Sequence, residues 1–205
     1  MFIYFVYLFA FLVNSLYCYR KDCIINKDKE NAIVLYKKYY DSLPLSLFNI
    51  VVVGYCGFHL VYMFYQPKPF NIYTSSVEFI ISLNMANVLF YFIHRFFHSV
   101  SFLSKYHRVH HEFKEPIGLR AAYTHPIDFF FGNLLPLGIT PFLLNMDIFT
   151  ISGLTYLSIY STIVREHSDY SDSRHHLDHH KYFNCNFGAK WLDKFFGTIK
   201  KNKLT

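Results

Sequence analysis

Long apolar runs constrain this chain most, because a soluble domain of its size cannot bury so much apolar surface. Of its 205 residues 53% are hydrophobic, and they include 24 Phe and 18 Tyr. Residues 2–19, 45–65 and about 75–93 are each long enough to cross a bilayer as a helix. The sequence therefore predicts an all-α, polytopic membrane protein with about four to five membrane helices and a histidine-rich helical cap on the cytosolic side.

Residues 127–164 form a further apolar stretch that is interrupted in its first half. Pro136, Gly138 and Pro141 disturb a regular helix there, and Asn145-Met146-Asp147 is typical of a turn. Backbone that is not helical is tolerated at membrane depth only where protein or water surrounds it. We therefore expect a helical hairpin that dips into the membrane and returns.

The ends of the earlier spans can also be predicted. Residues 20–43 carry many charges and are expected to form an amphipathic or loop segment. Pro67 and Pro69 should end the second span, because proline cannot continue a helix. Ser75 or Ser76 should cap the third span, because a serine side chain accepts a hydrogen bond from a free helix N–H group.

The distribution of Lys and Arg predicts one orientation in the membrane. Basic residues gather in 20–43 and in 94–125, whereas 66–70 contains a single lysine. The positive-inside rule then places the first two segments in the cytosol and the N-terminus in the lumen. Residues 2–19 lack the positively charged start of a signal peptide, which favours a retained anchor over a cleaved one.

Eleven of the twelve histidines lie between His94 and His180. Most fall into three boxes with helical spacing, and residues at i, i+3 and i+4 share one face of a helix. Each box therefore aims two or three imidazoles in one direction. His59, alone in an apolar run, is expected to be structural. The boxes are HRFFH with His94 and His98, HRVHH with His107, His110 and His111, and HHLDHH with His175, His176, His179 and His180, and single histidines lie between them at His125 and His167.

So many imidazoles indicate a metal centre. Neutral imidazole suits iron, zinc, copper and nickel, and eight or more converging rings exceed what one tetrahedral zinc ion needs. We therefore predict two metals in one cage. The predicted ligands are His94, His98, His107, His110, His111, His125, His167, His176, His179 and His180. For His125 and His167 the alternative is a hydrogen-bonding role behind the ligands. Partners for the imidazole N–H groups are expected among His175, Glu112, Glu166, Asp169 and Asp178.

Other classes of protein fit the sequence less well. The net charge of +6 comes without an aromatic platform for nucleic acid, so no nucleic acid is expected. No GxGxxG fingerprint is present, so NAD(P)H and flavin must be bound by a separate protein. A metal transporter would hold its histidines near the bilayer midplane, and a zinc hydrolase of the HExxH type would need that motif, which is absent.

The three boxes, in this order, resemble those of the membrane-bound fatty acid hydroxylase and sterol desaturase superfamily, whose pattern is HxxxH, HxxHH and HxxHH. The resemblance covers roughly residues 75–199 and is strongest to the C-4 methylsterol oxidases. In that pattern His176, rather than His175, belongs to the third box. The segments that carry the resemblance are HRFFH, KYHRVHHEFKEPIGLRAAYTHP, EHSDY, RHHLDHHKYFNCNFG and WLDKFFGT.

We expect residues 1–74 to form N-terminal membrane anchor helices with a basic loop, because of their apolar runs. For residues 75–205 the resemblance implies a fatty acid hydroxylase-like catalytic domain. It implies two iron ions, O2 as co-substrate, and electrons from NAD(P)H through cytochrome b5 or a reductase. The implied substrate is a membrane lipid or sterol, in the endoplasmic reticulum, with the site facing the cytosol. C-4 methylsterol oxidation ranks first, ahead of C-5 sterol desaturation and fatty acid hydroxylation.

Overall fold

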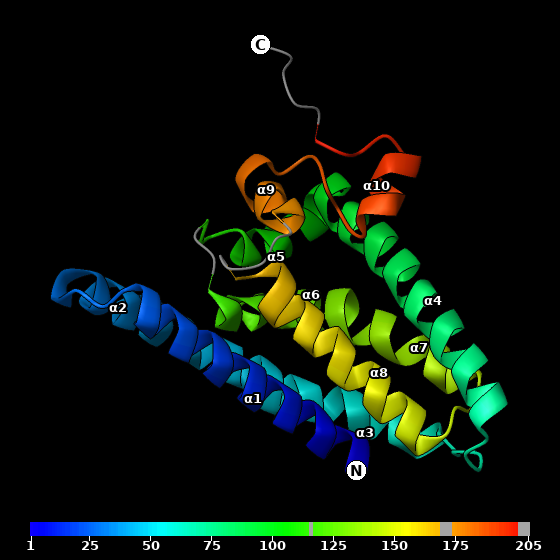
Figure 1. The fold of residues 1–205 in the computed structure, drawn as a ribbon. Coiled ribbons are helices and arrows are strands. Elements are labelled where there is room, and N and C mark those ends of the chain that lie inside the picture. Colours follow the sequence, from blue (N-terminus) through cyan, green and yellow to red (C-terminus); the bar gives the residue numbers. More distant parts are fainter. Residues whose placement is uncertain (115–116, 169–173, 201–205) are drawn as a thin grey trace.

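A computed structural model describes residues 1–114, 117–168 and 174–200 (Figure 1), and within these ranges the chain is helical and contains no strand. Segments labelled η1, η3 and η4 are π-helical and η2 is a 3-10 helix. The elements are α1 (Phe2–Ile25), α2 (Lys29–Leu47), η1 (Phe48–Val53), α3 (Gly54–Phe64), α4 (Ile72–Ser99), α5 (Ser101–His110), η2 (Gly118–Ala122), α6 (Pro126–Asp128), η3 (Phe129–Leu134), α7 (Leu135–Leu143), α8 (Ile148–Tyr160), η4 (Ser161–Glu166), α9 (His175–Tyr182) and α10 (Lys190–Phe195).

Four helical stretches are long and apolar enough to cross a membrane. They are Phe2–Ile25, Lys29–Phe64, Ile72–Ser99 and Pro126–Leu143. Most of their apolar side chains remain exposed on the outside of the bundle, as lipid-facing residues do. The predicted all-α polytopic architecture is therefore confirmed.

The second span is longer than predicted, because the charged segment before it is also helical. Asp28 caps α2 by accepting a hydrogen bond from the Asn31 backbone N–H at 2.9 Å, and the helix then continues through η1 into α3. Small polar residues face inward along this rod. Ser46 Oγ donates to the Leu119 carbonyl, and Asn49 Nδ2 donates to the Ala122 carbonyl. The predicted boundary near residue 45 is therefore wrong. The segment 20–43, expected to be amphipathic or a loop, is helical up to Ile25 as part of α1 and again from Lys29 onward.

The second and third spans are joined by a loop that touches the hairpin turn. α3 ends at Phe64, just before Pro67, as predicted. Asn71, and not Ser75 or Ser76, caps α4, because its side chain accepts from the Tyr73 and Thr74 backbone N–H groups. Ser75 instead donates to the buried carboxylate of Asp147 at 2.6 Å. That bond ties the start of α4 to the predicted turn at 145–147.

The core lies where α1 crosses α8 and the segment η2 passes beneath the cap. Tyr7, Phe11 and Cys18 of α1 are buried against Ile163 and its neighbours. α1 and η2 approach so closely that a side chain at Gly118 would meet the Cys18 sulfur at 2.7 Å. This packing fixes η2, and with it the backbone that follows the second histidine box.

The histidine boxes gather at one end of the bundle. Figure 1 shows α4 rising to that end, where α5, α9 and α10 form a small cap, while the N-terminus and the hairpin turn lie at the opposite end. α8 and η4 return from the turn to the cap. The C-terminal ends of α4 and η4 therefore lie beside the cap helices, at the same end of the bundle.

Candidate metal centre

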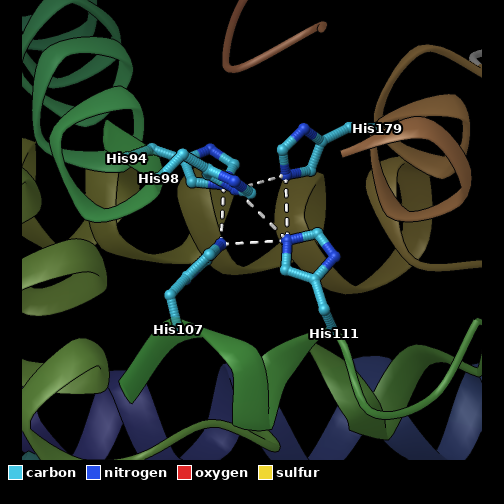
Figure 2. A group of neighbouring side chains, drawn as sticks. All are labelled: His94, His98, His107, His111 and His179. Atoms are coloured by element: carbon cyan, nitrogen blue, oxygen red, sulfur yellow. Dashed lines mark hydrogen bonds between the residues drawn. The ribbon is translucent and has the colours of Figure 1, made fainter. Parts of the chain in front are cut away.

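Five imidazoles from three helical elements converge in the cap (Figure 2). His94 and His98 lie in the last turns of α4, His107 lies in α5 and His111 directly after it, and His179 lies in α9. One ring nitrogen from each lies within 4.8 Å of all the others. We call these residues the five-histidine group.

The facing nitrogens of this group are the Nε2 atoms. His94 and His107 approach to 3.0 Å, and His98 and His179 to 3.1 Å. His111 Nε2 lies 3.1 Å from both His107 and His179 and 3.3 Å from His98. With metal–nitrogen bonds of about 2.1 Å, adjacent ligands of an octahedron are about 3.0 Å apart and those of a tetrahedron about 3.4 Å. The observed spacing therefore suits ligands around one ion.

A second cluster, the four-histidine group, lies beside the first. It comprises His110, His167, His176 and His180, whose nitrogens also lie within 4.8 Å of one another. His167 and His110 approach to 3.3 Å between Nε2 atoms, and His176 and His180 to 3.2 Å. The ring centroids of His180 and His111 lie 4.7 Å apart, so the two groups are in direct contact.

Backbone carbonyls fix the protonation of several rings. In the five-histidine group, His94 Nδ1 donates to the Phe187 carbonyl at 2.6 Å and His179 Nδ1 to the Cys185 carbonyl at 2.7 Å. A carbonyl oxygen only accepts, so each Nδ1 carries a hydrogen. Each neutral ring then presents a bare Nε2 lone pair to its neighbours.

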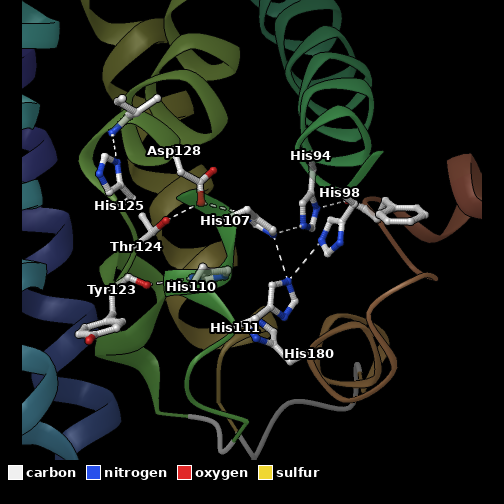
Figure 3. Close-up of polar contacts among 12 residues, drawn as sticks. His94, His98, His107, His110, His111, Tyr123, Thr124, His125, Asp128 and His180 are labelled. Carbon is white, nitrogen blue, oxygen red and sulfur yellow. Dashed lines mark hydrogen bonds and ion pairs between the residues drawn. The ribbon is translucent and has the colours of Figure 1, made fainter. Parts of the chain in front are cut away.

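The same arrangement holds in the four-histidine group. His110 Nδ1 donates to the Tyr123 carbonyl at 3.1 Å (Figure 3). His167 Nδ1 donates to the Thr162 carbonyl at 2.8 Å. Two bare Nε2 atoms therefore face each other at 3.3 Å. Neither can donate to the other, so a buried pair of this kind needs a cation or a donor between its members.

Burial keeps these rings neutral. It lowers the pKa of His110 to about 4 and that of His167 to about 3. Burial, reinforced by the neighbouring imidazoles, also holds the pKa of the other cap histidines far below the usual value, namely those of His111, His176, His179 and His180. Metal binding requires neutral imidazole. The donor set is therefore ready for a metal near neutral pH, and its nitrogens match iron or zinc rather than calcium or magnesium.

The predicted ligand His125 lies outside both groups and needs correction. Its Nδ1 accepts a hydrogen bond from the Ile127 backbone N–H at 3.2 Å, which makes it the cap of α6. Its ring packs on Tyr106 with centroids 4.5 Å apart. Figure 3 shows it turned toward that backbone and away from the converging rings. The structure thus brings together the other nine predicted ligands.

The acidic residues predicted to hydrogen-bond to the ligands have other partners. Glu112 is exposed and accepts from the Tyr123 hydroxyl, and Asp178 pairs with Lys200 at 3.1 Å. The Glu166 carboxylate accepts a hydrogen bond from the Ser161 hydroxyl and interacts electrostatically with Arg165 and His175. Asp169 lies outside the described residues. None of the described acidic candidates therefore contacts a converging imidazole.

The ring of His175 also lies outside both groups, which agrees with the choice of His176 for the third box. Its Nε2 lies 2.8 Å from the Asp193 carboxylate, which is fully buried. The same carboxylate accepts from the Phe187 and Gly188 backbone N–H groups. Burial alone would raise the pKa of Asp193, but these hydrogen bonds hold it below its ordinary range. His175 therefore supports the backbone behind His94 through Asp193.

Asp128 is the acidic partner that the sequence reasoning missed. Its carboxylate accepts from His107 Nδ1 at 2.7 Å and from the Thr124 hydroxyl, and its side chain is buried. A carboxylate behind a ligating histidine fixes the ring and raises its basicity. The signal that could have found it is the scarcity of acidic residues in the apolar stretch 127–164, where Asp128 and the turn residue Asp147 stand alone.

Two adjoining groups of neutral imidazoles at the end of a bundle of apolar helices provide the donor set of a histidine-ligated metal site in a membrane protein. A sequence model described as fatty acid hydroxylase matches residues 79–198. The chain therefore belongs to the fatty acid hydroxylase family. The matched region contains all nine converging histidines.

Several curated proteins are similar to the chain. Fatty acid hydroxylase domain-containing protein 2 of Homo sapiens is 32% identical over 135 residues, which is 63% of this chain and 40% of the relative. Lathosterol oxidase of Homo sapiens is 29% identical over 77% of this chain and 56% of its own length. A putative methylsterol monooxygenase of Dictyostelium discoideum is 31% identical over 65% of this chain and 53% of its own length. The chain thus spans about half the length of these relatives, and no solved structure shows significant similarity.

Proposed function

We propose that this protein is a membrane-bound non-haem di-iron oxygenase that oxidises a C–H bond of a lipid or sterol with O2. One observation carries the proposal. Nine imidazoles, seven of them buried and those of His98 and His110 half-buried, form two adjoining groups. His110 and His167 face each other through bare nitrogens that only a cation or donor satisfies. Five and four nitrogen donors divide naturally between two ions. When bound, the iron pair supplies the O2 and redox chemistry that side chains lack.

The chain's own residues hold and orient this donor set. The carbonyls of Phe187, Cys185, Tyr123 and Thr162 fix the tautomers of four rings. Asp128 does the same for His107 and adds a negative charge beside an otherwise neutral donor set. Burial keeps bulk water from the rings, which favours oxidation of a substrate over release of the oxidant into solvent.

A cavity of about 1160 Å³ supports a lipid or sterol substrate. It reaches from the membrane bundle to the third histidine box. Leu83 and Phe90 of α4, Leu137 of α7 and Leu157 of α8 contribute apolar walls, and His176 lines its other end. Such a shape suits a molecule with a long apolar body and one end at the metal centre.

Within this class we rank the reactions as the sequence does, with C-4 methylsterol oxidation first. C-5 sterol desaturation and fatty acid hydroxylation follow, since the relatives include a putative methylsterol monooxygenase, a lathosterol oxidase and a fatty acid hydroxylase. The test is sterol and fatty acid profiling in hosts that lack each candidate oxidase. Rescue by the wild-type chain, lost in His110→Ala, names the substrate class. No change in any host would contradict the proposal.

The electron donor and the compartment are parts of the same proposal. We expect electrons from NAD(P)H to arrive through cytochrome b5 or a reductase, with the site facing the cytosol at the endoplasmic reticulum. Exposed Arg95 and Arg108 beside the boxes suit an acidic donor. The metal-transporter alternative is weaker, because the histidines sit at the end of α4 and in the cap rather than at mid-membrane.

A further inference from the structure

The short helix α10 exposes large aromatic side chains outside the four apolar spans. Trp191 is 51% exposed and Phe195 is 78% exposed, and the two are one turn apart on the same side of the helix. The opposite side is buried, with Leu192 in the core and Asp193 beneath His175. The cap therefore leaves about half of Trp191 and most of Phe195 uncovered, and this exposure calls for another partner.

The aromatic side of α10 is continuous with the outer surface of α4. Phe196, directly after α10, packs on Phe92 of α4 with ring centroids 5.3 Å apart, and on Phe195 at 4.9 Å. Phe92 and Phe96 are 47% and 56% exposed on α4. Figure 1 shows α10 lying against the cap end of α4. The apolar outer face of a membrane span thus runs without a break onto α10.

The position of Phe92 along α4 sets the depth of this contact. α4 begins at Ile72, shortly after the loop that contains Lys68. From Ile72 to Phe92 the helix rises about 30 Å at about 1.5 Å per residue, which is the thickness of the hydrocarbon core. Phe92 therefore lies at the cap-side boundary of the core, and α10 lies at the level of the lipid headgroups.

The composition of α10 matches that level. Tryptophan is enriched at the membrane interface because its ring is apolar and its N–H is polar. Lys190 and Lys194 are exposed on the same short helix, and lysines at this depth extend their charge toward the headgroups. We propose that α10 is an interfacial membrane anchor, with Trp191 and Phe195 inserted among the lipids around α4.

This anchor ties the cap to the bilayer at the cavity. Gly188, Ala189 and Lys190 line the cavity together with Asn87 and Phe90 of α4. Asp193 holds the backbone N–H groups of residues 187 and 188. Seating α10 in the interface therefore places this edge of the cavity at headgroup level, where a lipid can enter from the side.

The experiment uses the only tryptophan of the chain, so the wild-type protein carries its own reporter. Full-length protein is placed in phosphatidylcholine nanodiscs whose acyl chains are brominated either near the headgroup or near the chain end. We expect Trp191 emission to be blue-shifted relative to the unfolded chain, and quenched more by the shallow bromines than by the deep ones. Aqueous iodide should quench it weakly.

A matched control places a tryptophan at a known depth. Ile80 is 62% exposed and lies near the middle of the Ile72–Phe92 stretch of α4, so Ile80→Trp in a Trp191→Phe background should be quenched most by the deep bromines. Phe195→Ser should shift Trp191 emission to the red and increase iodide quenching. The proposal is overturned if wild-type Trp191 is quenched by iodide and not by bromine. It is also overturned if neither quencher reaches Trp191, which would indicate contact with a second copy instead.

Discussion

The two histidine groups differ in the hydrogen-bond acceptors of the ring nitrogens that point away from the centre of each group. The five-histidine group has a buried carboxylate, Asp128, on the outer nitrogen of His107. In the four-histidine group the described outer contacts are neutral carbonyls, those of Tyr123 and Thr162. A carboxylate makes the ring a stronger donor than a carbonyl does. The comparison suggests that two similar sets of imidazoles hold their metals with unequal strength.

The largest effect should come from neighbouring residues that belong to different groups. His179 and His180 are adjacent in α9 and both buried. His179→Ala should remove the metal of the five-histidine group only, and His180→Ala that of the four-histidine group only. Each substitution should weaken its own site by more than about 100-fold, beyond the effect of losing an outer partner. Elemental analysis measures the metal content of both variants. If each variant lost both metals equally, the two groups would have to be treated as one site.

Asp128→Asn should weaken the five-histidine group selectively. The amide cannot provide the negative charge that stabilises His107, so metal affinity there should fall about 10–100-fold, while the four-histidine group keeps its metal. Competitive chelator titration of the purified protein follows both sites. Glu112→Gln is the matched control, because Glu112 is acidic but exposed and contacts Tyr123. A similar loss in the control, or none in Asp128→Asn, would contradict the role of Asp128.

Metal-free protein should lose stability as the pH falls. In the folded chain burial lowers the pKa of His110 to about 4 and that of His167 to about 3, whereas the unfolded value is about 6.5. The unfolded chain therefore binds more protons over this range, so the free energy of unfolding rises with pH. Stability should be full above pH about 6.5 and decline toward pH about 4, by up to about 1.4 kcal/mol per pH unit for each ring.

Melting of the metal-free protein in detergent between pH 8 and pH 5 checks this, with buffers of constant ionic strength. His110→Gln removes one titrating ring, so it should flatten the pH dependence of the melting temperature. A slope unchanged by the substitution would show that the pKa of His110 does not differ between the folded and the unfolded chain.

The smallest effect is expected from Asp193→Asn. Asp193 does not contact a converging ring but supports His175 and the backbone of Phe187, whose carbonyl orients His94. The substitution should lower metal affinity in the five-histidine group severalfold and lower the melting temperature of the cap. Chelator titration and thermal melting measure the two effects. His175→Ala should resemble it, and a stronger effect than that of Asp128→Asn would reverse the proposed order.

Helical spacing predicted the converging histidines of the three boxes, because i, i+3 and i+4 positions share a face wherever a helix forms. It says nothing of the single histidines His125 and His167, of which only His167 converges. Pro126 opens α6 and makes His125 its cap. The outer partners could not be read from spacing, since Asp128 and Asp193 reach rings 21 and 18 positions away in sequence. Those contacts depend on how α5, α6, α9 and α10 pack.

The same distinction holds for the fold. Apolar runs predicted the spans, because length and hydropathy are local properties. The helix α2 was not predicted, because its first residues are charged and its inward-facing side chains are polar. Ser42, Ser46 and Asn49, which lies just beyond α2, form hydrogen bonds with residues of η2 that exist only in the folded chain. Ser75 and Asn71 are both suitable helix caps, and the long-range bond from Ser75 to Asp147 decides between them.

The central claim is most directly tested by counting the metal. Protein purified in mild detergent and reconstituted with ferrous iron without oxygen should hold two irons per chain, with the Mössbauer spectrum of a pair in nitrogen-rich sites after oxidation. His125→Ala should hold the same amount. Iron that does not exceed a trace in the wild-type chain, or that is unchanged when both His179 and His180 are replaced, would contradict the account.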